Sequence, residues 1–409
     1  MNALDGIRVV DLTHAISGPT CTNALVQMGA EVVKVEPPHV GDGFRHYTEH
    51  AGEPLLSVPF ASINAGKRSI ALDLKIDAAR EVLWTLVERA DILVENYRPG
   101  VLARLGFAIE DLRRRNPRLI VVSITGFGQS GPLAQWGAYD HIAQAISGIA
   151  ALGAIDGEPR KIGLPIIDSF AGYIAVIGAL AALRRRDATG AGEHVDVAML
   201  DAALKLANQT VSIHSYTGQT PGGSGNRGFR MVPTSEFYPT GEGWIALGAN
   251  NQPQVEALLR VLGAEAMLAD SRMADHAARV ANHDFVRAWL TDRLAGWRAE
   301  DLEKALTDAR VPAAMIRDVG GIVTHPHMVQ RGSLDMVHLP GHDRPLATMG
   351  PGFITAGEPD SASAPTPPRR VPVLGADGEA ILAELGYDAA AVAALRGKGV
   401  ALRGKGMAA

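Results

Sequence analysis

The first 130 residues alternate short β-branched runs with stretches of helical periodicity, and this alternation limits the possible folds more than any other feature of the chain. Runs rich in Val and Ile predict strands, and apolar residues spaced three or four apart predict helices. The predicted strands are 7–12, 31–36, 69–74, 92–97 and 119–125, and the helical stretches between them are 20–28, 78–89 and 109–115. Strict alternation of this kind is typical of an open, mainly parallel sheet covered by helices. We therefore predict an α/β fold, with residues 1–219 forming the N-terminal part of a large domain.

A second, smaller domain is predicted between residues 220 and 330. It opens with the glycine-rich loop PGGSGNRGFR, followed by one strand-like run at 244–247 and by helical patterns that start near Gln252, Asp284 and Ala299. One strand with several helices favours a small α+β domain inserted into the large one.

The remaining residues, 331–409, become rich in Pro, notably at 364–372. Such a composition favours an extended segment that returns to the large domain or crosses to a partner subunit. The hexapeptide ALRGKG occurs at 394–399 and again at 401–406, and we predict that this duplication forms a frayed basic tail.

Composition narrows the class of ligand. The 409 residues carry 39 Lys and Arg against 44 Asp and Glu, without a run of five basic residues, so nucleic acid and anionic membranes are not expected as partners. Cys21 is the only cysteine, which excludes an intramolecular disulfide and any multi-cysteine metal site and fits a reducing cytoplasm. Asp5, Arg8 and Asp11 interrupt the apolar stretch that an export signal needs. We expect a cytoplasmic protein that acts on small molecules.

The longest apolar run extends from Phe170 to Leu183 and is followed directly by three arginines. It is shorter than the ~20 residues that a helix needs to cross a bilayer. We predict a buried core helix here and no membrane association.

One pattern matches a zinc site, but its surroundings argue against that function. His46, Glu49 and His50 form H-x-x-E-H, which on a helix would place two imidazoles on zinc with the glutamate as a base. The flanking sequences GDGF and AGEP indicate a solvated loop instead. We therefore expect no metal site.

A second pattern matches the dinucleotide-binding fingerprint. Gly126, Gly128 and Gly131 form G-x-G-x-x-G directly after a predicted strand. The fingerprint needs a helix to start at the third glycine, whereas Pro132 follows here and the next helical pattern starts near Tyr139. We predict a glycine turn that allows a ligand to approach the backbone closely.

Asp168 is the carboxylate with the most unusual surroundings. It lies among Ile166, Ile167 and Phe170, at the start of the long apolar helix. One interpretation is an N-cap that accepts hydrogen bonds from the N–H groups two and three residues later. The other is a poorly hydrated nucleophile that attacks a thioester and forms an acyl-aspartyl anhydride. The residues alone leave both interpretations open.

With Asp168 in place, the whole chain resembles the class III coenzyme A transferases, the family of the formyl-CoA:oxalate and carnitine CoA-transferases. The resemblance follows ordered landmarks, and it identifies SITGFGQSGP at 123–132 as a family signature and not a nicotinamide site. The other landmarks are LDGIRVVDLTHAISGPTCT at 4–22, MGAEVVKVEPP at 28–38, GKRSIALDLK at 66–75, ADILVENYRPGVLARLGF at 90–107, YDHIAQAISG at 139–148 and GEHVDVAMLDA at 192–202.

The resemblance implies an open α/β large domain made by both chain ends, a small inserted domain, and two ring-like subunits interlocked as a homodimer. It also implies that Asp168 is the catalytic nucleophile. CoA would move between an acyl-CoA and a small carboxylic acid. Acyl-CoA and CoA would be substrates, and no cofactor would be bound permanently.

The resemblance further places the CoA site. Tyr97 would stack on adenine, and Lys75 and Arg104 would contact the phosphates. Alternatively, Tyr97 is a core aromatic residue and Arg104 is a solvated helix charge. The residues that the resemblance assigns to this site are His14, Ala15, Leu72, Asp73, Leu74, Lys75, Asn96, Tyr97, Arg98, Arg104 and Tyr139.

The sequence departs from the oxalate-specific branch of the family at the CoA site and in the glycine-rich loop. Pro37 and Gly137 stand where that branch carries basic residues, so Arg98 or Arg45 would have to supply the missing charge. The loop PGGSGNRGF lacks an unbroken run of four glycines, which argues against oxalate as the acceptor.

Two arginines beside the glycine-rich loop suggest a different acceptor. Arg227 or Arg230 could hold the distal carboxylate of a dicarboxylic acid such as succinate, with a solvated loop arginine as the alternative.

The main alternative function is that of an α-methylacyl-CoA racemase, a related isomerase. Racemases place a histidine base just before the aspartate that corresponds to Asp140, and here Tyr139 occupies that position. A tyrosine with a pKa of ~10 is a poor base at neutral pH, although His141 keeps this alternative open.

Overall fold

The computed structural model describes residues 2–47, 56–223, 225, 227, 231–341, 343–355, 369–398 and 400. Contacts divide the chain into two compact units. The first comprises Met1–Ile149, Lys161–Gln219 and Gly332–Ala409, and the second comprises Ala150–Arg160 and Thr220–Arg331.

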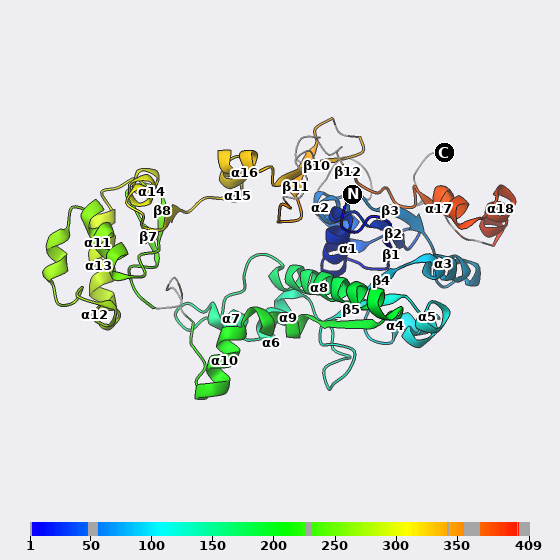
Figure 1. Cartoon of the computed structure of the whole chain (residues 1–409), viewed down its shortest axis with the longest axis horizontal. Coiled ribbons are helices and arrows are strands. Elements are labelled where there is room, and N and C mark those ends of the chain that lie inside the picture. The colour runs from blue at the N-terminus through cyan, green and yellow to red at the C-terminus, as the bar shows by residue number, and fades with distance from the viewer. Residues whose placement is uncertain are drawn as a thin grey trace. The chain divides into compact units, whose positions relative to one another are not determined.

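A six-stranded parallel sheet forms the centre of the first unit, in the order β3-β2-β1-β4-β5-β6 (Figure 1). This confirms the predicted α/β class and each predicted strand within a few residues. The edge strand β6 was not predicted, because its five residues, HVDVA, form only a short pattern. The strands are β1 Arg8–Asp11, β2 Glu31–Glu36, β3 Arg68–Ala71, β4 Ile92–Glu95, β5 Ile120–Thr125 and β6 His194–Ala198.

Helices cover both faces of this sheet because the inner strands are apolar on both faces. Val9 and Ile92 belong to one core with α1 (Ser17–Gln27), α8 (Ile166–Thr189) and α9 (Met199–Leu206). Their neighbours Val10 and Leu93 point to the other face and belong to a second core with α3 (Asp77–Arg89) and α5 (Ile109–Arg115). Shorter helices of this unit are α2 Val58–Asn64, α4 Val101–Arg104, α6 Asp140–Ile146 and α10 Asn208–Thr217; α7 Ile149–Leu152 lies at its boundary.

Helix α8 is longer than the apolar run predicted and is buried along one face only. Ala171, Ala175 and Ala179 are fully buried in the core, whereas Tyr173 and Ile177 are exposed. By length and composition it is the one helix of the described residues that could span a membrane, and 44% of its apolar window is buried in the fold. The prediction of a buried core helix therefore holds for one face of α8.

The C-terminal part of the chain is more regular than its Pro content predicted. β10 (Leu334–His338) pairs with β11 (Leu346–Met349) and with β12 (Arg369–Arg370). Two further helices, α17 (Gly378–Leu385) and α18 (Ala389–Gly397), complete the second core of the first unit.

The first ALRGKG copy does not form the tail that was predicted. Leu395, which it contains, is buried in the second core together with Val400, so its apolar side chain overrides the basic composition. The copy at 401–406 lies outside the described residues.

The second unit contains a three-stranded antiparallel sheet in the order β7-β8-β9, packed against helices. The predicted strand at 244–247 is β8, and the three predicted helices start at Gln252, His283 and Ala299. The elements are β7 Phe237–Pro239, β8 Trp244–Leu247, β9 Ala313–Met315, α11 Gln252–Val261, α12 His276–Ala281, α13 His283–Leu294, α14 Ala299–Asp308, α15 Val319–Val323 and α16 Pro326–Arg331.

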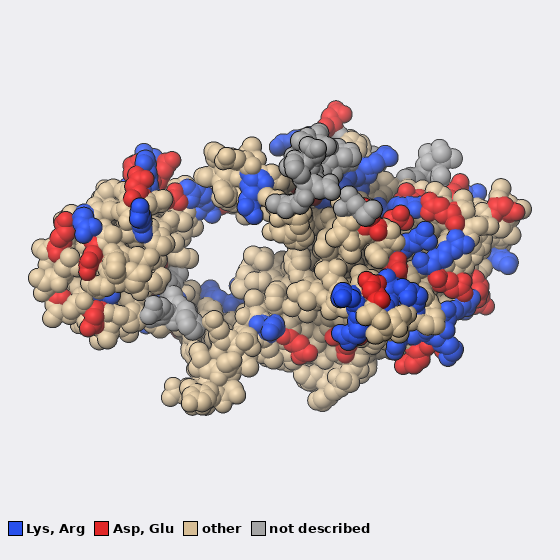
Figure 2. Space-filling model, in the orientation of Figure 1, with Lys and Arg blue, Asp and Glu red and all other residues tan. Residues whose placement is uncertain are grey.

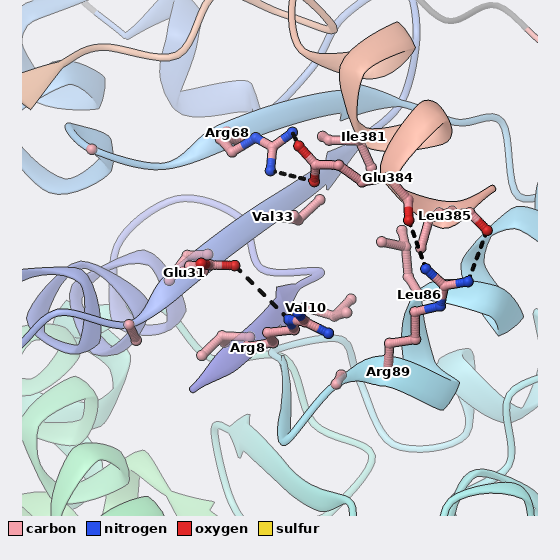
Figure 3. Close-up of a pocket in the computed structure, with 15 residues that line it drawn as sticks. Arg8, Val10, Glu31, Val33, Arg68, Leu86, Arg89, Ile381, Glu384 and Leu385 are labelled. Carbon is pink, nitrogen blue, oxygen red and sulfur yellow. Dashed lines mark hydrogen bonds and ion pairs between the residues drawn. The ribbon is translucent and has the colours of Figure 1, made fainter. Parts of the chain in front are cut away.

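A cavity of about 630 Å³ lies at the amino ends of β1, β2 and β3, between α3 and α17 (Figure 3). Its arginines are occupied by neighbouring groups. Arg68 forms two 2.8 Å hydrogen bonds with Glu384, and Arg89 donates to the main-chain oxygens of Glu384 and Leu385. We interpret these contacts as the attachment of α17 to the sheet.

Candidate active site

The candidate site lies at the carboxyl ends of β1 and β4. The chain proceeds from β1 to β2 and β3 on one side, and from β4 to β5 and β6 on the other. Open parallel sheets bind ligands outside the carboxyl ends of their strands at such a reversal of strand order. His14 follows β1 and Asn96 follows β4, and they meet: His14 N donates to Asn96 Oδ1 at 2.9 Å, and Asn96 Nδ2 donates to the His14 carbonyl at 2.8 Å.

The loop of residues 13–15 is held by side chains at nearly every main-chain polar group. Thr13 N donates to Asp11 Oδ1 at 2.8 Å, and the Thr13 carbonyl accepts from Lys34 Nζ at 2.7 Å. Ala15 N donates to Asp42 Oδ1 at 2.9 Å. Ala15 has a φ of +62°, a left-handed conformation that a non-glycine residue keeps only when its surroundings enforce it.

A buried ion network supports this loop. Lys34 Nζ lies 3.0 Å from Asp42 Oδ2, and Lys67 Nζ lies 3.0 Å from Asp11 Oδ2. Burial raises the pKa of Asp11, but Lys34 and Lys67 outweigh it and hold that pKa well below its ordinary value. Burial, followed by Lys34, lowers the pKa of His14, so its imidazole is neutral at neutral pH.

Arg45 does not supply the phosphate charge suggested for it. Its side chain is buried and forms two 2.7 Å hydrogen bonds with Glu36 and one of 3.0 Å with the Pro372 carbonyl. The prediction was wrong for Arg45, because a neighbouring carboxylate already neutralises its charge.

Arg98, in contrast, lies beside Gly137, the glycine that stands where the oxalate-specific branch carries a basic residue. A Cβ built on Gly137 would lie 2.7 Å from Arg98 Nη2, so the guanidinium fills the space that a side chain at position 137 would need. Arg98 is exposed, as are Lys75 and Arg104. These three cations are therefore accessible to a ligand.

The remaining residues predicted for the CoA site lie around an apolar patch. Leu72 is buried, and Leu74 and Tyr97 pack against the same core. The ring centroid of Tyr97 is 5.8 Å from that of His14, and Asp73 Oδ1 accepts a 3.0 Å bond from Lys75 N. Arg80, which the sequence did not indicate, donates to the Leu74 carbonyl at 3.1 Å.

Asp168 lies in the first turn of α8 and is not its N-cap, so that interpretation was wrong. Residue 165 occupies the cap position, and the carboxylate that accepts from the helix belongs to Asp140. Asp140 Oδ2 accepts from Ile167 N at 2.7 Å and from Asp168 N at 3.1 Å. Gln144 Nε2 donates to the other oxygen of Asp140 at 2.5 Å. A partner 28 residues away has replaced the local cap.

The two neighbouring carboxylates differ in their hydrogen bonds. Both oxygens of Asp140 accept hydrogen bonds, whereas within the described part of the chain the carboxylate of Asp168 accepts none. Burial, followed by the Asp140 charge, raises the pKa of Asp168 to about 7. A poorly solvated carboxylate of this kind is a better nucleophile than one that is fully hydrogen-bonded.

Helix packing brings Asp168 near the 13–15 loop. A Cβ built on Gly172 would lie 2.6 Å from the carbonyl oxygen of Ser17, so α8 crosses the start of α1 closely. Asp168 precedes Gly172 by about one helical turn, or roughly 6 Å along the axis. The nucleophile predicted by resemblance and His14 with Ala15 thus lie in one region of the first unit.

The predicted glycine turn is present after β5. Gly128 and Gly131 both have positive φ, and α6 starts only at Asp140. Tyr139 precedes α6 with 75% of its surface exposed and stacks on His141.

The H-x-x-E-H pattern extends beyond the described residues. Glu49 and His50 lie outside the described residues, and His46 Nε2 lies 2.9 Å from the Val40 carbonyl. Among the described residues, no group of three or more His, Cys, Asp or Glu could hold a metal ion.

Comparison with known proteins identifies the class. The model of CoA-transferase family III matches residues 4–378. The chain is 38% identical to acetyl-CoA:oxalate CoA-transferase of Acetobacter aceti, over 81% of this chain and 85% of the relative. It is 36% identical to succinyl-CoA:mesaconate CoA-transferase of Haloarcula hispanica, over 94% and 97%. The crystal structure of a CAIB/BAIF family protein from Brucella suis superposes with a TM-score of 0.83 at 32% identity, covering 94% of this chain and all of that one.

The chain belongs to CoA-transferase family III. It is an enzyme that transfers CoA between an acyl-CoA and a carboxylic acid.

Proposed function

We propose that CoA transfer proceeds through an acyl-aspartyl anhydride on Asp168. The observation that carries this proposal is the contrast between two adjacent carboxylates, because Asp140 is held by three hydrogen bonds while the carboxylate of Asp168 accepts none within the described residues. The Asp168 carboxylate attacks the thioester carbon, the C–S bond breaks, and the CoA thiolate leaves with the bonding electron pair.

The remaining steps return the enzyme to its starting state. The acceptor carboxylate attacks the Asp168 carbonyl carbon of the anhydride and displaces the donor acid. The CoA thiolate then attacks the acyl carbon of the new anhydride, which gives the product thioester and frees Asp168. His14, Ala15, Asn96 and Tyr97 hold the CoA near Asp168 throughout, and the exposed cations Lys75, Arg98 and Arg104 meet its phosphates.

Mass spectrometry tests the reaction type. The enzyme is incubated with an acyl-CoA and a set of carboxylic acids in normal and deuterated water. New acyl-CoA masses that depend on the added acid support the transferase, whereas deuterium at the α-carbon without exchange would indicate the racemase.

We infer that the acceptor is a dicarboxylic acid. The two relatives described above are named for oxalate and mesaconate, which are both dicarboxylic. Oxalate should therefore be assayed beside succinate, although the glycine-rich loop argues against it as the acceptor. In the second unit, Arg227 is exposed at the wall of a cavity of about 530 Å³, together with His283 and Arg287. Glu236 already bonds both His283 and Arg287, whereas Arg227 interacts with the charge of the exposed Asp284. We therefore take Arg227 as the cation of this wall that binds a second carboxylate. Arg230 lies outside the described residues.

Arg227→Ala should raise the KM for succinate about tenfold and leave the KM for butyrate within about twofold, because only succinate offers a distal carboxylate. Steady-state kinetics with both acceptors measures this. Arg298→Ala is the matched control, since Arg298 is an exposed arginine of the same unit that pairs with Glu242. Equal effects of Arg227→Ala on both acceptors would exclude this role.

We propose that the enzyme is a homodimer. The outer face of α8 exposes Tyr173 and Ile177, the latter by 63%, and Tyr216 on α10 is 94% exposed. The α10 sequence NQTVSIHSYT contains no Lys, Arg, Asp or Glu, and charged side chains gather instead over α3 and α5 (Figure 2). Exposed apolar side chains of this size are often covered by a partner, and a second copy of the chain is the simplest one.

Ile177→Asp should therefore produce monomers, because it places a charge on the proposed contact without disturbing the core of the single chain. Light scattering measures the mass, and Ile177→Val serves as the control that should remain dimeric. An Asp variant that stays fully dimeric at low micromolar concentration would exclude α8 from the interface.

A further inference from the structure

Glu95 is a buried acid to which the transfer steps assign no role. It is the last residue of β4, only 3% exposed, and directly precedes Asn96 and Tyr97. Its Oε2 accepts a hydrogen bond of 2.8 Å from Tyr97 N. The side chain of Glu95 thus holds the main chain at the turn that carries two residues of the proposed CoA site.

Glu95 is itself part of a row of polar side chains across three strands. Ser123 is its direct neighbour on β5, and the Ser123 hydroxyl group lowers the pKa of the Glu95 carboxyl group. Ser123 Oγ lies 3.0 Å from Nε2 of His194, which stands on β6. Side chains on adjacent strands of one sheet face fix each other's positions. The row therefore places polar side chains beside the Glu95 carboxyl group, in addition to the Tyr97 N–H group.

The environment of Glu95 suits a group that both donates and accepts. Burial, with a smaller contribution from Asp196, raises its pKa to about 7, while the hydrogen bonds from Ser123 and Tyr97 N oppose this rise. The protonated acid can accept from Tyr97 N–H with one oxygen and donate to Ser123 with the other. Glu95 also lines a cavity of about 180 Å³ together with Arg98, one of the exposed cations proposed to meet the CoA phosphates.

We propose that Glu95 is a positioning residue for CoA, which holds the Asn96–Tyr97 turn against His14 through the Tyr97 N–H group. This inference rests on the proposed location of CoA beside Asn96 and Tyr97. Glu95 does not touch the reacting atoms, so its loss should weaken binding of CoA more than it slows the chemical step.

The test compares Glu95→Ala, Glu95→Gln and Glu384→Ala in the full-length enzyme. Calorimetry gives the Kd for CoA, and steady-state kinetics gives KM and kcat with an acyl-CoA donor. Glu95→Ala should raise both the Kd and the KM about tenfold, with kcat within about threefold of wild type, because a buried N–H loses its acceptor. Glu95→Gln keeps an acceptor and a donor, so it should restore both values to within about threefold. Glu384→Ala removes a carboxylate of α17 that lies beside the amino ends of the strands, whereas Glu95 lies at the carboxyl end of β4. This control should change neither value (Figure 3).

An Ala variant that binds CoA like the wild type would overturn the inference, and so would a fall in kcat with an unchanged Kd. If Glu95→Ala does not fold, Ser123→Ala replaces it and should raise the Kd about threefold, and an unchanged Kd in that variant overturns the inference. A wild-type enzyme that neither binds CoA nor exchanges acyl groups would refute the proposed function itself, which is a distinguishable result.

Discussion

Asp168→Asn should lower CoA transfer by at least about 1,000-fold while CoA binding and the free energy of unfolding remain nearly unchanged. The amide has the size and shape of the carboxylic acid but cannot form an acyl anhydride. Stability should hold because the N–H groups at the start of α8 bond to Asp140, so no cap is lost at position 168. The substitution also removes the repulsion between the two carboxylates, so any change in the free energy of unfolding should be a small increase.

Hydroxylamine trapping provides the direct measurement. Added with the donor thioester, it should convert Asp168 of the wild type into a hydroxamate that is visible in the peptide mass. Asp187→Asn is the matched control, because Asp187 is an exposed residue of the same helix and should keep full turnover. Substantial turnover by Asp168→Asn, or wild-type turnover without an adduct on Asp168, would rule out the covalent mechanism.

The parts of the fold that the sequence predicted well are those with strong local patterns. Residues 31–36 form β2 and residues 109–115 form α5 as predicted, because each run combines a clear period with good end signals. The strand β6 and the helices α17 and α18 were missed. Their patterns are short, and Pro-rich sequence lies close to the two helices, so only the packing of Leu382 and Leu395 in the core makes their role clear.

The candidate site could be predicted from the sequence only in part. Asp168 was noticed for its apolar surroundings, but its local interpretation as a cap failed because the acceptor of the helix N–H groups comes from Asp140, on a different helix. A single sequence gives no signal for such a contact. The sequence likewise gives no signal that Asp42 accepts a hydrogen bond from Ala15 N or that Glu95 accepts one from Tyr97 N. The residues proposed for the CoA site came from family resemblance, and the reversal of strand order at β1 and β4 supplies a physical reason to expect a ligand there.

Asp140 should control both the pH dependence and the rate of the reaction. Asp168 must be ionised to attack, and its pKa is raised to about 7, so wild-type kcat/KM should fall as the pH drops below about 7. Asp140→Asn removes the neighbouring negative charge and lowers this pKa, although burial still holds it above its ordinary value. The acidic limb should therefore move to lower pH, and the variant should lose less activity than the wild type between about pH 8 and about pH 6.

Asp140→Ala separates this charge effect from the structural one. It removes the same charge, so its acidic limb should also move to lower pH, but it leaves Ile167 N and Asp168 N without their acceptor. Loss of such a cap costs about 1 kcal/mol of stability. The first turn of α8 should then position Asp168 less accurately, and kcat at about pH 8 should fall at least about tenfold. The kcat of Asp140→Asn, which keeps one oxygen acceptor, should fall less.

Thermal unfolding and pH–rate profiles of both variants provide the measurements. An acidic limb that stays in place in both variants would show that Asp140 does not act on the charge of Asp168, and equal rates of the Asn and Ala variants would show that its hydrogen bonds do not position the nucleophile.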